Sequence, residues 1–173
     1  MTTKPWLAQY PPEIPHTLSY EAIPVQEYLT RAYQNYPEKV AIHFLGKDIT
    51  YQELYESSLK FANYLRSLGI QKGDRVAIML PNCPQNVIGY YGILYAGAIV
   101  VQTNPLYTER EIAYQIKDSG AKAILSLDIL YPRISKVIKE TDLENLIITG
   151  IKDYLPFPKN LLYPFVQKKQ YGF

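Results

Sequence analysis

Apolar runs and helical spacings alternate along most of the chain. A continuous apolar run at residues 76–80, followed by proline and asparagine, is typical of a strand buried on both faces in a parallel sheet. Further runs predict strands at residues 98–101, 121–125 and 146–149. Helical spacing lies between them, at residues 84–96, between Thr108 and Gly120, and around residues 134–138. This alternation predicts an α/β fold: a doubly wound, largely parallel, flavodoxin-like sheet flanked by helices.

A helix and a small hairpin are predicted ahead of this sheet. The helix ends before Pro37 and has an apolar face made of Val25, Tyr28, Leu29, Ala32, Tyr33 and Tyr36. Residues 40–44 alternate between two faces, and Gly46-Lys47 offers a tight turn into residues 48–50. A second helix follows, with a core side made of Leu54, Phe61, Ala62, Leu65 and Leu68. Capping boxes at Thr50-Glu53 and Thr108-Glu111 predict where two helices begin.

The stretch between Arg75 and Glu109 contains no charged side chain. A transmembrane segment is the alternative to a buried β-α-β unit here. The run without strongly polar residues at 87–101 is shorter than the roughly 20 residues that a bilayer requires, and glycines interrupt it. The β-α-β unit is therefore preferred. Its helix begins at Pro84, stops at Gly97, and has a predicted apolar face of Val87, Ile88, Tyr91, Leu94 and Tyr95.

Three segments follow from these patterns. Residues 1–24 hold five prolines and no period, which predicts an extended N-terminal arm. Residues 25–150 form the α/β portion. Residues 151–173 mix aromatic residues, prolines and lysines. Contact with a membrane surface is one interpretation of that mixture; because prolines oppose a long amphipathic helix, an irregular connection to a missing subdomain is preferred.

Composition excludes several classes of function. The net charge of +2 on 173 residues is too balanced for a nucleic-acid surface. One cysteine rules out an internal disulfide framework and suits a reducing compartment. No secretory signal is evident, so the cytoplasm is the expected location, and a peripheral contact with the inner face of the membrane stays open.

Candidate chemistry in the residues themselves is sparse. The sequence holds no phosphate-binding loop, no G-x-G-x-x-G and no metal-ligand cluster, so no catalytic or metal-binding residue is assigned. Cys83 at a helix start is a possible nucleophile, since a helix N-terminus lowers a thiol pKa, but without a candidate base a packed thiol is preferred. His43 is expected to be a solvated strand residue rather than a ligand.

Three motifs resemble a known family. Residues 49–54 (ITYQEL), 73–82 (GDRVAIMLPN) and 95–105 (YAGAIVVQTNP) are similar, in order and spacing, to the opening of the acyl-adenylate-forming, AMP-binding enzymes. Residues 4–7 and 104–107 point to bacterial long-chain-fatty-acid–CoA ligases. The resemblance covers essentially the whole chain and implies the N-terminal part of such an enzyme.

The resemblance implies a particular reaction. These ligases join a long-chain fatty acid to ATP, giving an acyl-adenylate and pyrophosphate, and then transfer the acyl group to coenzyme A, with Mg²⁺ as cofactor. The residues that handle the triphosphate lie beyond this part of the family. The chain is therefore expected to serve as scaffold and to bind none of these cofactors tightly by itself.

Two sets of residues receive candidate roles from the resemblance. Asn104, Pro105, Leu106 and Tyr107 are expected near the mouth of the coenzyme A channel; a loop made rigid by Pro105 is the alternative. Arg133 and Lys136 are candidates for contacts with nucleotide phosphates, against simple solvation.

The resemblance also suggests partners. Some long-chain members form homodimers through their N-terminal part, which would give the arm a partner. A non-catalytic interaction or dimerisation module of the same fold is the competing hypothesis.

Overall fold

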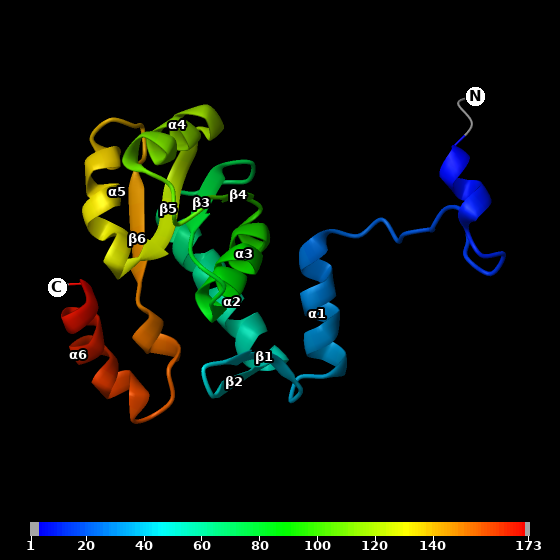
Figure 1. Cartoon of the computed structure of the whole chain (residues 1–173), viewed down its shortest axis with the longest axis horizontal. Helices are drawn as coiled ribbons and strands as arrows, with labels where there is room; N and C mark the ends of the chain where they lie inside the picture. The colour runs from blue at the N-terminus through cyan, green and yellow to red at the C-terminus, as the bar shows by residue number, and fades with distance from the viewer. Residues whose placement is uncertain (1–3, 172–173) are drawn as a thin grey trace.

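The computed structural model describes residues 4–171, and a parallel sheet of four strands forms the centre of the molecule (Figure 1). The strands are β3 (Arg75–Met79), β4 (Ile99–Gln102), β5 (Ala121–Leu127) and β6 (Asn145–Thr149). Their order is β4-β3-β5-β6, so the chain starts inside the sheet, moves to one edge and then crosses to the other side. This is the doubly wound arrangement, and the predicted flavodoxin-like sheet is confirmed.

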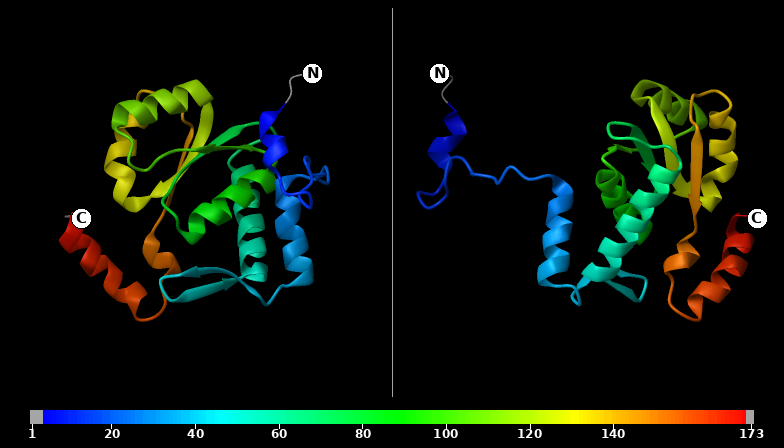
Figure 2. Two further views of the ribbon diagram at one scale, coloured as in Figure 1. Left: turned by 45° about the vertical axis from the view of Figure 1, so that its right-hand side comes forward. Right: turned by 180° about the vertical axis from the view of Figure 1, so that it is seen from behind.

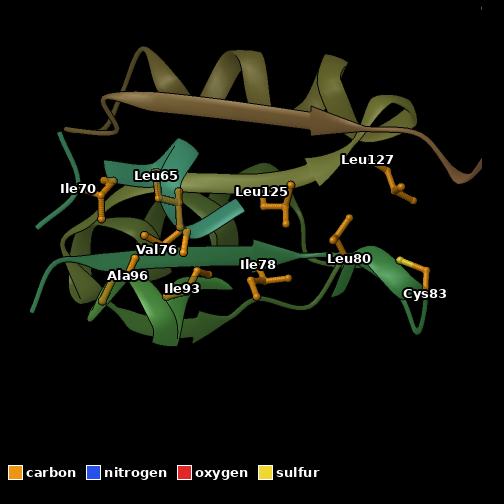
Figure 3. Close-up of a cluster of buried hydrophobic side chains, with 13 residues drawn as sticks. Leu65, Ile70, Val76, Ile78, Leu80, Cys83, Ile93, Ala96, Leu125 and Leu127 are labelled. Atoms are coloured by element: carbon orange, nitrogen blue, oxygen red, sulfur yellow. The ribbon is translucent and has the colours of Figure 1, made fainter. Parts of the chain in front are cut away.

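Helices cover both faces of the sheet. Alternate residues of a strand point to opposite faces, and β3 shows this directly. Val76 and Ile78 pack with α2 (Tyr51–Ser67) and α3 (Pro84–Ala96), and Figure 3 shows this cluster. Ala77 and Met79 pack with α4 (Glu109–Ser119) and α5 (Tyr131–Ile138) on the other face. The continuous apolar run of β3 thus reflects burial on both sides.

The buried side of α3 differs from the predicted face. The residues that it buries are Pro84, Gln85, Ile88, Gly89, Gly92, Ile93 and Ala96, whereas Val87, Tyr91 and Tyr95 are only partly buried. The helix packs against the sheet and α2 at once, so apolar spacing could not single out one face. Its glycines permit the close approach: a Cβ on Gly92 would lie 2.7 Å from Cδ1 of Phe61 and 2.9 Å from the carbonyl oxygen of Ser58.

Strand β4 also departs from expectation. It was predicted as a buried strand, but it pairs only with β3 and lies at the edge of the sheet. Ile99 is consequently half exposed, at 50 %. An apolar run does not reveal whether the strand has one neighbour or two.

The N-terminal half adds α1 (Val25–Asn35) and the predicted hairpin, formed by β1 (Val40–Phe44) and β2 (Lys47–Thr50). The turn consists of Leu45 and Gly46, both with positive φ, rather than Gly46-Lys47. Both predicted capping boxes are present, with Glu53 N–H donating to Thr50 and Glu111 N–H donating to Thr108. Half of the predicted apolar face of α1 is covered: Leu29 is buried and Ala32 and Tyr33 are partly buried, while Val25, Tyr28 and Tyr36 are about half exposed.

Aromatic contacts attach α1 to the body. Tyr33 stacks on Tyr55 with ring centroids 4.3 Å apart, and Tyr55 meets the edge of Tyr95. The Tyr95 hydroxyl donates to the Gln26 carbonyl at 3.0 Å and also bonds to the Thr30 hydroxyl. Side chains from three helices thus hold α1 in place.

The two ends of the chain lie on opposite sides of the molecule (Figure 2). The predicted arm runs away from the body and contains a short 3₁₀ helix, η1 (Pro5–Gln9). Two further 3₁₀ helices are η2 (Asp128–Leu130) and η3 (Ile151–Tyr154). Among residues 4–171, no helix combines the length and apolar character needed to cross a bilayer.

The expectation of an irregular segment at residues 151–173 is wrong for most of its length. Helix α6 (Lys159–Tyr171) forms there, with Pro164 inside it. Pro156 and Pro158 precede the helix, and the Pro158 carbonyl accepts hydrogen bonds from Leu161 and Leu162 at 3.1 and 3.3 Å. A proline ahead of the first turn removes no helical hydrogen bond, and the single one lost at Pro164 does not stop the helix.

Candidate functional site

The carboxyl ends of the four parallel strands meet at one edge of the sheet. Ligands of open α/β sheets bind outside these ends, where the strand order reverses, which here is between β3 and β5. The loop after β4 lies at the same edge and contains the predicted site residues 104–107. The topology thus brings these residues to the region where such folds bind ligands.

A tight turn shapes the loop at 104–107. The Tyr107 N–H donates to the Asn104 carbonyl at 3.1 Å, and the Leu106 N–H donates to the Asn104 side-chain oxygen at 2.9 Å. Pro105 follows Asn104, where its restricted φ suits a turn. Leu106 lies at the tip with 84 % of its surface exposed. An apolar side chain is therefore presented to solvent on a hydrogen-bonded turn.

Arg133 of α5 is hydrogen-bonded to the backbone of this turn. Its Nη1 donates to the carbonyl oxygens of Pro105 at 3.1 Å and Tyr107 at 2.8 Å. Lys136 forms an exposed ion pair with Glu109, with 2.7 Å between Nζ and Oε1. Both cations considered for phosphate contacts are thus engaged within the chain. Rigidity of the loop comes from Arg133 as well as from Pro105, and sequence spacing could not reveal this contact between distant residues.

A groove of about 720 Å³ runs from the loop along α4. Its lining residues are Tyr107, Thr108, Arg110, Glu111, Tyr114, Gln115 and Asp118. A recess of about 380 Å³ adjoins this groove at Tyr107, Thr108 and Arg110 and is also bordered by Leu106 and Arg133. Hydrogen bonds from the Thr108 N–H and hydroxyl lower the pKa of Glu111, which keeps this carboxylate ionised beside the groove.

Sequence reasoning missed Gln85. This side chain is 5 % exposed, and its Nε2 donates to the Gly150 carbonyl at 2.8 Å, joining the start of α3 to the end of β6. Within the described part of the chain, its Oε1 has no hydrogen-bond partner, and neither has the buried hydroxyl of Thr103. A polar residue at the second position of a helix that begins at Pro84 was the available signal. These two groups make the carboxyl edge more polar than its sequence suggested.

The structure brings Cys83 and His43 to one groove of about 510 Å³ without coupling them chemically. Cys83 is buried at the start of α3, and burial raises the pKa of its thiol although backbone N–H groups of Asn86 and Gln85 oppose the shift. The His43 Nδ1 forms a hydrogen bond with the carboxylate of Asp48 on the neighbouring strand. Burial thus disfavours the thiolate that a nucleophile requires. No cluster of metal-binding side chains occurs within residues 4–171.

Solved structures identify the class of domain. The chain resembles a long-chain-fatty-acid-CoA ligase from Archaeoglobus fulgidus with a TM-score of 0.71 and 22 % identity, over 80 % of this chain and 30 % of that one. A benzoate CoA ligase from Burkholderia xenovorans LB400 gives a TM-score of 0.68 at 27 % identity, over 72 % of this chain and 25 % of that one. The fold is that of the N-terminal domain of AMP-binding CoA ligases.

Sequence comparison gives the family. The profile described as AMP-binding enzyme matches residues 29–172, and the chain belongs to that family. It is 52 % identical over 167 residues to the long-chain-fatty-acid–CoA ligase of Bacillus subtilis (strain 168), covering 96 % of this chain. The chain spans about 30 % of the length of that relative and matches its N-terminal part. The resemblance inferred from the three sequence motifs is confirmed.

Proposed function

We propose that this chain is the N-terminal framework of a long-chain-fatty-acid–CoA ligase. In that reaction the fatty-acid carboxylate attacks the α-phosphorus of ATP and releases pyrophosphate. The thiol of coenzyme A then attacks the acyl carbonyl and releases AMP. Mg²⁺ bound to the complete enzyme would neutralise charge on the transferring phosphate. The observation that carries the proposal is the 52 % identity to the Bacillus subtilis ligase over 96 % of this chain.

The chain alone acts as scaffold in this proposal. A nucleophile must ionise readily, and a residue that binds phosphate must have a free cationic group. The candidates considered above do not meet these requirements in the described part of the chain. Arg133 holds backbone carbonyls, Lys136 pairs with Glu109, and burial disfavours the Cys83 thiolate. Titration of the chain with ATP and with coenzyme A by calorimetry should give no tight binding; tight ATP binding would contradict the scaffold role.

We propose that residues 104–107 border the coenzyme A channel. The hydrogen-bonded turn, the exposed Leu106 and the two grooves that Tyr107 lines support this role. A chimera tests it, with this chain joined to the remaining part of the Bacillus subtilis ligase. The chimera should make acyl-CoA, and Leu106→Asp should raise KM for coenzyme A while KM for ATP stays unchanged. A folded but inactive chimera would contradict the proposed function.

An exposed arm favours a second role, homodimerisation. Apolar side chains along the arm are 41–77 % exposed: Trp6, Tyr10, Ile14, Leu18 and Tyr20. Such a strip suits contact with a second copy in the cytoplasm. Sedimentation velocity of this chain and of residues 25–173 tests the idea, because only the longer chain should dimerise. A dimer of residues 25–173 would exclude dimerisation through the arm.

A further inference from the structure

A cavity of about 180 Å³ lies at the carboxyl end of β6, on the face of the sheet that α2 and α3 cover. Apolar side chains from both helices and from β5 and β6 form most of its wall: Phe61, Ile88, Leu125 and Ile147. Figure 3 shows Leu125 among the side chains of this face. Tyr107 and the groove along α4 belong to the opposite face. The cavity is therefore separate from the loop at 104–107.

One hydrogen-bond acceptor in the wall of this cavity is unused. The Gln85 Nε2 donates to the Gly150 carbonyl, and this bond fixes the amide, because a flipped amide would set two oxygens against each other. Among residues 4–171, Oε1 of Gln85 has no partner, although the side chain is buried. A buried acceptor without a donor is unfavourable. A bound molecule that donates a hydrogen bond to Oε1 would remove this cost.

The other polar groups of the wall are engaged within the chain. The Tyr154 hydroxyl interacts with the Ser57 side chain, and the Thr149 hydroxyl donates to the Asp153 carboxylate at 3.4 Å. In the described part of the chain, no charged residue lines the cavity. An ionised ligand would lose its hydration here without gaining an opposite charge. The cavity thus favours an uncharged molecule with one hydrogen-bond donor.

The volume of the cavity limits the size of that molecule. An engineered protein cavity of about 150 Å³, lined by leucine, isoleucine and phenylalanine, binds benzene. A volume of about 180 Å³ therefore suits one six-membered ring with a small substituent. A nucleotide, coenzyme A or a long acyl chain is far larger.

We propose that this cavity binds a small uncharged molecule that combines one aromatic ring with one hydroxyl or amino donor, as phenol does. The ring contacts Phe61, Ile88 and Leu125, and the donor forms a hydrogen bond with Oε1 of Gln85. The site goes beyond the proposed function, because the substrates of the ligase reaction do not fit it.

Titration of this chain with phenol, followed by heteronuclear NMR, tests the proposal. Phenol should cause saturable shifts at the amides of Gln85, Gly89 and Gly150. Benzene should bind about fivefold more weakly or worse, because it cannot donate to Oε1. Benzoate, which is ionised at neutral pH, should not bind. Equal affinities for phenol and benzene, binding of benzoate, or no saturable shift with phenol would overturn the proposal.

A matched pair of variants tests the role of the Gln85 oxygen. Gln85→Met removes the acceptor and should abolish the preference for phenol over benzene. The control is Gln115→Met on α4, where the amide also donates to a backbone carbonyl and also has an Oε1 without a partner in the described residues. This control should bind phenol as the unmodified chain does. Equal losses of phenol binding in both variants would contradict the assigned acceptor.

A third variant fills the cavity without touching the amide. In Gly89→Ala the new methyl group displaces the end of Leu125, whose Cδ2 lies 2.6 Å from the ideal Cβ position. Phenol binding should fall about tenfold, because the displaced side chain takes up part of a small volume. Circular dichroism checks that each variant folds. Unchanged binding by a folded Gly89→Ala would place the phenol elsewhere and refute the site.

The chimera with the Bacillus subtilis ligase supplies the final check. It should bind phenol with the same preference over benzene as this chain does. If only the short chain binds phenol, the rest of the enzyme fills the cavity and the proposal fails. Acyl-CoA synthesis is measured separately. An active chimera that does not bind phenol refutes the cavity site alone, and an inactive chimera that binds phenol refutes only the proposed function.

Discussion

Arg133 donates a hydrogen bond of 2.8 Å to the carbonyl oxygen of Tyr107, a residue on the far side of α4 in the sequence. The same nitrogen reaches Pro105. One side chain on α5 therefore sets the conformation of the loop that follows β4. This contact connects the stability of the fold to the shape of the candidate site.

Replacing Arg133 by Met should loosen the loop. The change leaves two carbonyls without their donor, so the free energy of unfolding should fall by about 1–2 kcal/mol in urea titrations. Amide exchange at Leu106 and Tyr107 should quicken. The control is Lys136→Met, which breaks only an exposed ion pair and should change stability by about 0–0.5 kcal/mol. Equal effects of both changes would contradict the role given to Arg133.

Two glycines of α3 should differ in their tolerance of alanine. A Cβ at Gly92 would press on the Ser58 carbonyl and the Phe61 ring, whereas at Gly89 the nearest atom is the flexible end of Leu125, 2.6 Å away. Gly92→Ala should therefore cost about 1–3 kcal/mol in thermal or urea unfolding. Gly89→Ala should cost less, since Leu125 can move and alanine favours the helix. The opposite ranking would show that α3 packs differently.

Cys83 should react slowly with thiol reagents in the folded protein. Burial raises the pKa of its thiol, so the folded state disfavours the reactive thiolate. A disulfide reagent such as Ellman's at pH 8 should label the chain rapidly in urea and slowly without it. Fast labelling of the folded chain would contradict the buried position.

The same shift predicts how stability depends on pH. Because the folded pKa is raised, the unfolded thiol ionises first, and stability falls as pH rises above the ordinary thiol pKa of 9.0. Burial also raises the pKa of Tyr91, Tyr95 and Tyr154, but the ordinary tyrosine pKa is 10.0, so these groups affect stability only at higher pH. Unfolding of Cys83→Ala, followed in urea between about pH 8 and 9.5, should lack this decline.

Glu111 should contribute to stability in the acid range with the opposite sign. Its pKa is lowered by the Thr108 donors, so its contribution to stability is present above the ordinary glutamate pKa of 4.5 and is lost as pH falls through the folded pKa. Glu111→Gln should flatten the acid limb of a stability–pH profile. The control is Glu140→Gln, at an exposed glutamate after α5. The stability of this variant should fall more steeply with falling pH than the stability of Glu111→Gln.

Much of the fold followed from local patterns. The strand runs predicted the parallel sheet because burial on both faces demands continuous apolar residues, as at residues 76–80. Thr50 and Thr108 predicted two helix starts, since a capping box joins groups only three residues apart. The three motifs likewise identified the family. The contact of residues 104–107 with coenzyme A stays a prediction.

Tertiary structure decided what depends on distant neighbours. The buried side of α3 is set by where Ser58, Phe61 and Leu125 lie, and the ordered loop is set by Arg133. Helix α6 forms although prolines argued against one: Pro156 and Pro158 stand ahead of its first turn, Pro164 inside it removes only one helical hydrogen bond, and Lys159 at its start donates to the distant Leu45 carbonyl. A sequence determines by itself those features whose interacting groups are close along the chain. Contacts between residues far apart exist only once the whole chain has folded.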